Sequence, residues 1–142
     1  MNKAIYLILN QKLKEMEDWR THNTVFMLGT VLGRKLDDSY FGTEVVDASG
    51  INHAAIGNTV LPILEVKESD ILSFYKLCKE REKNGDFEVI DFTLTAQNSN
   101  MYEEYSAKLS SEKVEDQVIL GIALFGDQKM TRSICGSLAR WK

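Results

Sequence analysis

The chain contains 142 residues, of which 44% are hydrophobic and 27% are charged, and its formal net charge is −4. This composition excludes a disordered or collagen-like chain, and the length predicts a single domain over residues 1–142. The acidic balance argues against a nucleic-acid partner. Because the chain has two cysteines, no signal peptide and no apolar run of roughly 18 residues, we expect a cytoplasmic protein without membrane contact.

The N-terminal third combines a short apolar run with a long helical pattern. Residues 4–9 are continuously apolar, which is typical of a strand buried on both faces. After a polar loop at 10–18, apolar residues recur at spacings of three and four and predict a helix over about 21–36. Gly29 and Gly33 fall on one face of this helix, where we expect them to let it approach the sheet closely.

Two further strands are predicted before the middle of the chain. Residues 43–47 form the first, and the turn signature Ala-Ser-Gly at 48–50 closes it. Residues 60–66 form the second. Pro62 lies within it and cannot donate a backbone hydrogen bond, so we expect this strand at an edge of the sheet or at a bulge.

A second amphipathic helix and a third apolar run follow. Ser69 is the predicted N-cap of the helix, and Asn84 with Gly85 is the predicted stop. Residues 87–92 predict another strand. Residues 93–99 are polar and predict a turn.

The C-terminal third predicts two helices around a central strand. Asn100 and Glu103 resemble a capping box for a short helix that ends near residue 110. Residues 118–125 are strongly apolar, and Asp127 is the predicted cap of a last helix that stops at Gly136. In total, about five strands alternate with four helices. This pattern predicts an α/β fold of three layers, in which helices cover both faces of a mixed sheet of four to five strands.

No specific catalytic motif is present, because the sequence lacks the dinucleotide, Walker, nucleophile-elbow and paired-cysteine patterns. We therefore expect no cofactor. His22 and His53 with Asp47 are residue types that ligate zinc, but their spacing is not that of a zinc site, so no metal is predicted. Cys78 lies on the apolar face of its helix and is expected to be structural. For Cys135 a reactive role is the weaker alternative.

The most informative segment is 91–97, which places a carboxylate, two hydroxyls and an amide at the carboxyl end of a predicted strand. Ligands bind at this end of open α/β sheets. The alternative is that these side chains only satisfy backbone donors of the turn. A second polar segment, His22 and Asn23, lies at the start of the first predicted helix, where backbone N–H groups favour an anion. If the two groups meet, they form a polar cleft. The candidate ligand-binding residues are His22, Asn23, Asp91, Thr93, Thr95, Gln97 and Lys129.

Four segments of the sequence, taken in chain order, resemble those of a known family. They are Thr-His-Asn at 21–23, Asp-Ala-Ser-Gly at 47–50, the segment 91–97 and the glycine-containing stretch 121–138. The chain resembles, over nearly its whole length, the bacterial family numbered 2000 in the series of domains of unknown function. The resemblance implies a fold similar to peptidyl-tRNA hydrolase II, which has three α/β/α layers and is often dimeric. It implies no established activity.

The comparison with the hydrolase also shows a departure. Its motif Asp-Ala-Gly-x-Thr-Gln is similar to 91–97, with Asp91 and Thr95 at the functional Asp and Thr positions. The lysine that it carries at the start of the first helix has no match here. Arg20 is nearby, but a guanidinium stays charged and cannot act as a base. Residues 99–117 form an insertion. Peptidyl-tRNA hydrolysis is therefore not what the resemblance implies.

Three functions are carried forward. The first is a small-ligand-binding or regulatory module for a polar or anionic ligand. The second is a hydrolase of a small ester or amide, in which Asp91 or His22 is the general base and Lys129 or helix N–H groups stabilise an oxyanion. This function requires Asp91 and His22 to lie within about one water molecule of each other. The third is a homodimeric interaction protein with Trp19 or Trp141 as anchor.

Overall fold

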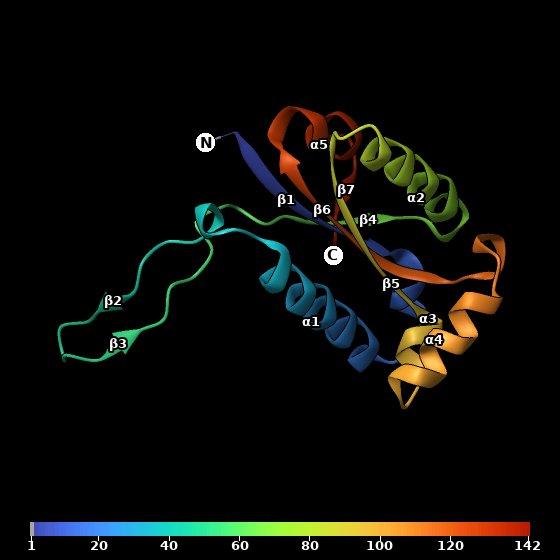
Figure 1. The fold of residues 1–142 in the computed structure, drawn as a ribbon, viewed down its shortest axis with the longest axis horizontal. Coiled ribbons are helices and arrows are strands. Elements are labelled where there is room, and N and C mark those ends of the chain that lie inside the picture. Colours follow the sequence, from blue (N-terminus) through green and yellow to red (C-terminus); the bar gives the residue numbers. More distant parts are fainter. Residues whose placement is uncertain (1) are drawn as a thin grey trace.

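A computed structural model describes residues 2–142, and its centre is a five-stranded mixed sheet (Figure 1). The strand order is β5-β6-β1-β4-β7. β1 and β4 are parallel, and the other neighbours are antiparallel. The strands are β1 (Lys3–Asn10), β4 (Ile63–Val66), β5 (Phe87–Thr93), β6 (Ile119–Asp127) and β7 (Ala139–Arg140).

Helices cover both faces of this sheet. One face is covered by α1, which packs on β5 and β6, and the other by α2 and α5. Two separate apolar clusters fill the two interfaces, so the predicted arrangement of helices on both sides of the sheet is confirmed. No helix within residues 2–142 has the length and apolar character needed to cross a bilayer. The helices are α1 (Asp18–Lys35), α2 (Glu68–Lys83), α3 (Leu94–Asn98), α4 (Tyr102–Ser111) and α5 (Gln128–Cys135), with short 3-10 helices at Gln11–Glu15, Asp38–Tyr40 and Val114–Asp116.

The two strongly apolar runs form the central strands, as predicted. Within β1, Leu7 and Leu9 belong to the cluster under α1, whereas Ile8 belongs to the cluster under α2 and α5. Side chains alternate across a strand, so a strand covered on both faces needs apolar residues at consecutive positions. β6 pairs with β1 along its length, with Leu7 opposite Ala123.

Local capping differs from the prediction at two helices and agrees at one. α2 begins at Glu68, before Ser69, and Lys67 at its N-cap makes no side-chain hydrogen bond. α4 also begins without a side-chain cap. The Asn100 side chain does not accept a hydrogen bond from the helix, and its backbone N–H donates to the Glu104 carboxylate (3.3 Å). The Asp127 carboxylate does cap α5, since it accepts from the backbone N–H of Met130 (3.0 Å).

The predicted turn at 93–99 is the short helix α3. Thr93 starts it, because its hydroxyl oxygen accepts from the backbone N–H of Ala96 (3.2 Å). The predicted loop at 10–18 likewise contains a 3-10 helix, whose N-cap is the Asn10 side chain. Threonine and asparagine oxygens replace missing helical acceptors, so a polar stretch after a strand can be a capped helix as well as a turn.

Pro62 does not place β4 at an edge, because this strand lies between β1 and β7. The strand begins after the proline, at Ile63. The carbonyl oxygen of Pro62 accepts from the backbone N–H of Leu7 (3.1 Å). A proline whose carbonyl oxygen accepts a hydrogen bond, and whose missing N–H is not needed, is compatible with an interior position at the start of a strand.

The close approach of α1 to the sheet depends on a glycine of the sheet and not on those of the helix. A Cβ atom at Gly29 or Gly33 would have nothing within 4 Å, so both glycines face away from the sheet. A Cβ atom at Gly121 of β6 would lie 2.9 Å from Thr24 Cγ2 and 3.0 Å from Leu28 Cδ1. The expectation for the helix glycines is therefore wrong, and Gly121 provides the contact.

Residues 42–61 extend away from the sheet and are called the arm below (Figure 1). Inside the arm, β2 (Val45–Val46) pairs with β3 (Asn52–His53) as a small antiparallel sheet. The predicted turn between them is present, and Gly50 adopts a φ of 82° that favours glycine. The predicted strand at 43–47 therefore exists but does not join the main sheet.

Both cysteines are free and buried in the cluster under α2 and α5. Burial raises the pKa of Cys78 and of Cys135 to about 12. At pH 8 only about one thiol in ten thousand is then ionised, and the thiolate is the reactive form. We expect a thiol-specific disulfide reagent to label neither residue in the native protein and both in guanidinium chloride. Rapid stoichiometric labelling of the native protein at pH 8 would contradict this.

Candidate functional site

The carboxyl ends of β1, β4 and β5 lie at the same end of the sheet, since β5 and β1 are both antiparallel to β6. Asn10 at the end of β1 is fully buried and holds this region together. Its amide donates to the carbonyl oxygen of Ile119 (2.8 Å), and its oxygen accepts from the backbone N–H of Lys12 (2.9 Å). Both polar atoms of this side chain are thereby satisfied.

The two predicted polar segments do meet at this end. The Gln97 amide donates to the Arg20 carbonyl oxygen (3.0 Å) and to Asn23 Oδ1 (3.2 Å). The Arg20 guanidinium donates to Gln97 Oε1 (2.9 Å) and to Asn98 Oδ1 (3.0 Å). The two polar segments therefore meet as expected. Their side chains, however, hydrogen-bond to one another and join α3 to α1.

The two threonines are engaged in the same way. Thr93 caps α3 and is buried. The Thr95 hydroxyl donates to the Glu112 carboxylate, at 2.9 Å from one oxygen and 3.0 Å from the other. Glu112 follows α4, so this bond ties α3 to the end of the next helix. For Thr93, Thr95 and Gln97 the structure supports the alternative in which polar groups serve the local backbone and neighbouring helices.

His22 and Lys129 lie elsewhere. His22 is exposed on α1, beside Val25, Phe26 and Trp141. Lys129 is exposed on α5, which follows the C-terminal end of β6 and therefore lies at the opposite end of the sheet from Thr93. Chain direction explains the error for Lys129, because an antiparallel strand carries its following helix to the other end. Neither residue belongs to the predicted cleft.

Asp91 faces the α2 side of the sheet. Its carboxylate accepts a hydrogen bond from the Tyr75 hydroxyl of α2 (2.9 Å). Its neighbours Ile90 and Phe92 belong to the cluster under α1, as strand alternation requires. His22 is on α1, across the sheet, so the pairing required for a hydrolase is not formed.

The possible zinc ligands are also separated. His53 Nε2 lies 2.9 Å from Asp47 Oδ2 within the arm, and this contact lowers the pKa of the Asp47 carboxyl below its usual range. His22 lies on α1. In residues 2–142 the structure contains no group of three or more His, Cys, Asp or Glu side chains placed to hold a metal ion.

Asp91 nevertheless borders a cavity of about 370 Å³ beside the outermost strand, which we call the edge pocket. Apolar and aromatic side chains from α1, β5 and α4 form most of its wall. Tyr102 and Tyr105 form an edge-to-face pair with ring centroids 5.5 Å apart. The edge pocket is lined by Met27, Val31, Asp91, Phe92, Ala96, Ser99, Asn100, Met101, Tyr102 and Tyr105.

The electrostatics of the edge pocket are set by Asp91. Burial and the nearby Asp91 charge raise the pKa of Tyr105. The same two causes raise the pKa of Tyr75 strongly, so its hydroxyl stays protonated and continues to donate to Asp91 at physiological pH. No lining residue from the described part of the chain is Lys, Arg or His. The edge pocket therefore has an apolar wall, and Asp91 borders it at the edge of the sheet, with its carboxylate on the α2 side of β5 but near enough to Tyr105 to raise the pKa of that residue.

The backbone of β5 adds polar groups beside the edge pocket. The backbone N–H of Val89 donates to the Glu82 carboxylate (2.6 Å) and so points away from β6. Alternate residues of a strand direct their backbone groups the same way, so the N–H and C=O of Asp91 also face outward. Sequence reasoning missed this site because its aromatic wall comes from 99–117, the insertion relative to the hydrolase. The only signal was the closely spaced Met101, Tyr102 and Tyr105.

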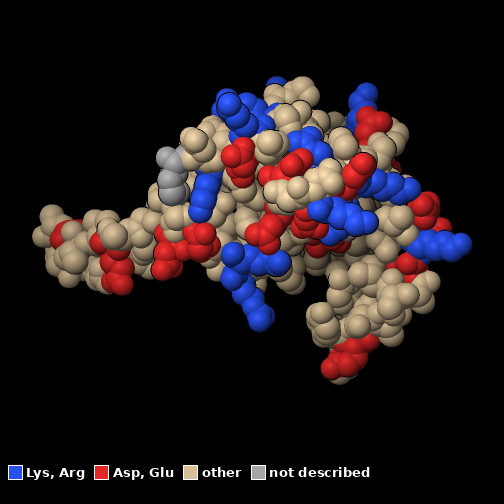
Figure 2. Space-filling view, turned by 45° about the horizontal axis from the view of Figure 1, so that its top comes forward, with Lys and Arg blue, Asp and Glu red and all other residues tan. Residues whose placement is uncertain are grey.

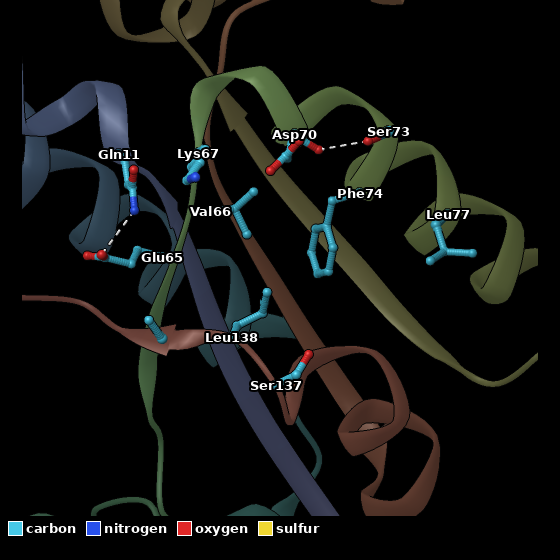
Figure 3. Close-up of a pocket in the computed structure, with 11 residues that line it drawn as sticks. Gln11, Glu65, Val66, Lys67, Asp70, Ser73, Phe74, Leu77, Ser137 and Leu138 are labelled. Atoms are coloured by element: carbon cyan, nitrogen blue, oxygen red, sulfur yellow. Dashed lines mark hydrogen bonds between the residues drawn. The ribbon is translucent and has the colours of Figure 1, made fainter.

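A second cavity, of about 540 Å³, lies between α2 and the segment around β7 (Figure 3). Two hydrogen bonds run along its wall. Gln11 donates to Glu65 (3.0 Å), and the Ser73 hydroxyl donates to the Asp70 carbonyl oxygen (3.0 Å), as the dashed lines show. Phe74 is the one aromatic side chain among the described residues that line this cavity, whereas Phe92 and the tyrosine pair line the edge pocket, so we take the edge pocket as the candidate site.

Comparison with known proteins agrees with this fold. The family of proteins of unknown function DUF2000 matches residues 4–142, and the chain belongs to this family. No curated protein matches the chain. A solved structure, that of the protein of unknown function Atu0240 from Agrobacterium tumefaciens strain C58, is similar with a TM-score of 0.77 and 13% identity, over 100% of this chain and 99% of that one. This likeness shows a shared fold, and no activity accompanies it.

Proposed function

We propose that this protein is a binding module for a small organic molecule with an apolar body and a cationic group. The observation that carries the proposal is the edge pocket itself, a mainly apolar cavity in which Asp91 is the only charged residue among the described lining residues. Small-molecule sites are typically of this size and combine apolar walls with a few polar groups. The apolar body would contact Met27, Val31 and the tyrosine pair.

The charge of the lining selects the ligand. An ammonium group near Asp91 gains a charge-assisted hydrogen bond, and the faces of Tyr102 and Tyr105 favour a cation as well. An anion would meet a carboxylate and no basic side chain among the described lining residues. The edge pocket therefore favours a cation over the anionic ligand suggested by the sequence.

Three probes with the same aromatic body and different charge test this proposal. We expect phenethylamine to stabilise the protein more than phenethyl alcohol, and phenylacetate to have no effect, in a thermal-shift titration at constant pH and salt. A ligand at about ten times its dissociation constant stabilises the folded state by about 1.4 kcal/mol, which for a chain of this length raises the melting temperature by about 5 °C.

Asp91→Asn is the decisive variant, because an amide oxygen still accepts from Tyr75 and the negative charge is lost. It should abolish the preference for the amine over the alcohol. Glu88→Gln is the matched control, since Glu88 is exposed on the same strand and does not line the edge pocket. No stabilisation by the amine at millimolar concentration, or equal stabilisation by phenylacetate, would refute the proposal.

We also propose that the fold is related to peptidyl-tRNA hydrolase II, which the mixed sheet covered on both faces supports. The relation is proposed for the fold and not for the activity. Arg20, near the position of the hydrolase lysine, is engaged with Gln97 and Asn98.

A further inference from the structure

The arm is the least covered part of the chain. Its large apolar side chains are exposed, with Ile56 at 79% of full exposure. A two-stranded hairpin alone is at best marginally stable in water, and clustered exposed apolar side chains mark an interaction surface. The exposed apolar residues of the arm are Val45, Val46, Ile51, Ile56, Val60 and Leu61.

A second exposed apolar surface runs along α1. Trp19, His22 and Phe26 occupy the same outward stripe as Gly29 and Gly33, because they are spaced by three and four residues. Phe26 is 75% exposed. Beside this stripe lies a groove of about 480 Å³, lined by Leu9, Thr21, His22, Val25, Phe26, Ile63 and Trp141.

We propose that these two surfaces cover each other in a homodimer, in which the arm of each copy lies over the groove of the other. The stripe is complementary to itself. In an antiparallel pair of α1 helices centred between residues 29 and 30, Phe26 of each copy lies over Gly33 of the second copy, where no side chain obstructs it. The arm leaves the C-terminal end of α1, so this pairing carries it toward the N-terminal half of the other α1 and its groove (Figure 1).

Charge complementarity favours the same partner. The arm contains Glu44 and Asp47 and no Lys or Arg, and Figure 2 shows acidic but no basic residues along it. The groove borders basic residues. Arg140 and Lys142 flank Trp141 in the sequence, and Lys14 Nζ, which is also ion-paired with Glu65 (2.5 Å), lies 4.8 Å from the Trp141 ring centroid. The arm, stripe and groove together also reach the roughly 20–30 residues a side of a stable interface.

The oligomeric state of the full chain tests the proposal. We expect sedimentation velocity over a micromolar concentration range to give twice the 16.1 kDa chain mass. Phe26→Asp and Ile56→Asp should each shift the protein to monomer without changing its circular dichroism, because both side chains are exposed within one chain. Leu77→Asp is the matched control, since Leu77 is exposed on α2, and this variant should remain dimeric.

A cysteine near the centre of the stripe gives a second measurement. Thr30→Cys should form a disulfide-linked dimer on mild oxidation, whereas Ser106→Cys on α4 should not, and the buried native cysteines should not contribute. A monomeric wild-type protein would show that something other than a second copy covers these surfaces and would overturn the proposal. A dimer that survives both aspartate substitutions would also overturn it.

Discussion

Replacing Gly121 by valine is expected to destabilise the protein by about 3 kcal/mol, at the upper end of the usual cost of overfilling a packed core. The first added carbon would lie 2.9 Å from Thr24 Cγ2 and 3.0 Å from Leu28 Cδ1, and two further methyl groups follow. α1 would have to move away from β6, which would weaken one of the two apolar cores. Urea unfolding followed by circular dichroism measures the loss.

The control for this variant is Gly42→Val, because a Cβ atom at Gly42 makes only an ordinary contact, 3.7 Å from the Ile56 carbonyl oxygen. Its effect should stay below about 1 kcal/mol. Leu28→Ala removes side-chain volume at the same contact, so it should cost less in the Gly121→Val protein than in the wild type. Additive effects of Leu28→Ala and Gly121→Val would argue against a direct clash.

Replacing Asn10 by leucine should cost about 3 kcal/mol, although the two side chains have similar volumes. The substitution leaves the Ile119 carbonyl oxygen and the Lys12 N–H without their partner in a fully buried region. An unsatisfied buried polar group costs about 1–3 kcal/mol. The free energy of unfolding from urea titration is the quantity to measure.

Asn84→Leu is the matched control for that substitution. Asn84 is exposed at the end of α2, and its side chain makes no hydrogen bond within the described residues. The expected change is below about 0.5 kcal/mol. Equal losses for the two asparagine variants would show that the buried hydrogen bonds of Asn10 are not what stabilises the native state.

The sequence predicted those elements whose own pattern of apolar residues shows which of their faces are buried. β1 and β6 are apolar at consecutive positions, and α1 shows the helical spacing, so each pattern reports how many sides of its element are covered. Capping was less predictable. Lys67 and Met101 precede helices without a side-chain cap, and a sequence rule that looks for Ser or Asn at that position selects the wrong residue.

The candidate site was predictable in residue types but not in geometry. Gln97 and Asn23 do meet, as their positions at one end of the sheet suggested. Asp91 and His22 do not, because one residue of register decides which face of a strand a side chain occupies. The edge pocket depends on α4 packing on α3 so that Met101 and the two tyrosines lie near α1 and the end of β5, an arrangement that no local pattern encodes.

The outer side of β5 has a further consequence for solubility. An outermost strand with free N–H and C=O groups invites strands of other molecules, and repeated addition leads to fibres. Here Glu82 takes the outward N–H of Val89. The opposite boundary of the sheet is β7, which has only two residues. Glu82 thus blocks one of the outward N–H groups of β5, and the shortness of β7 limits strand addition at the other margin, so losing the Glu82 carboxylate would make β5 more open to strands of other molecules.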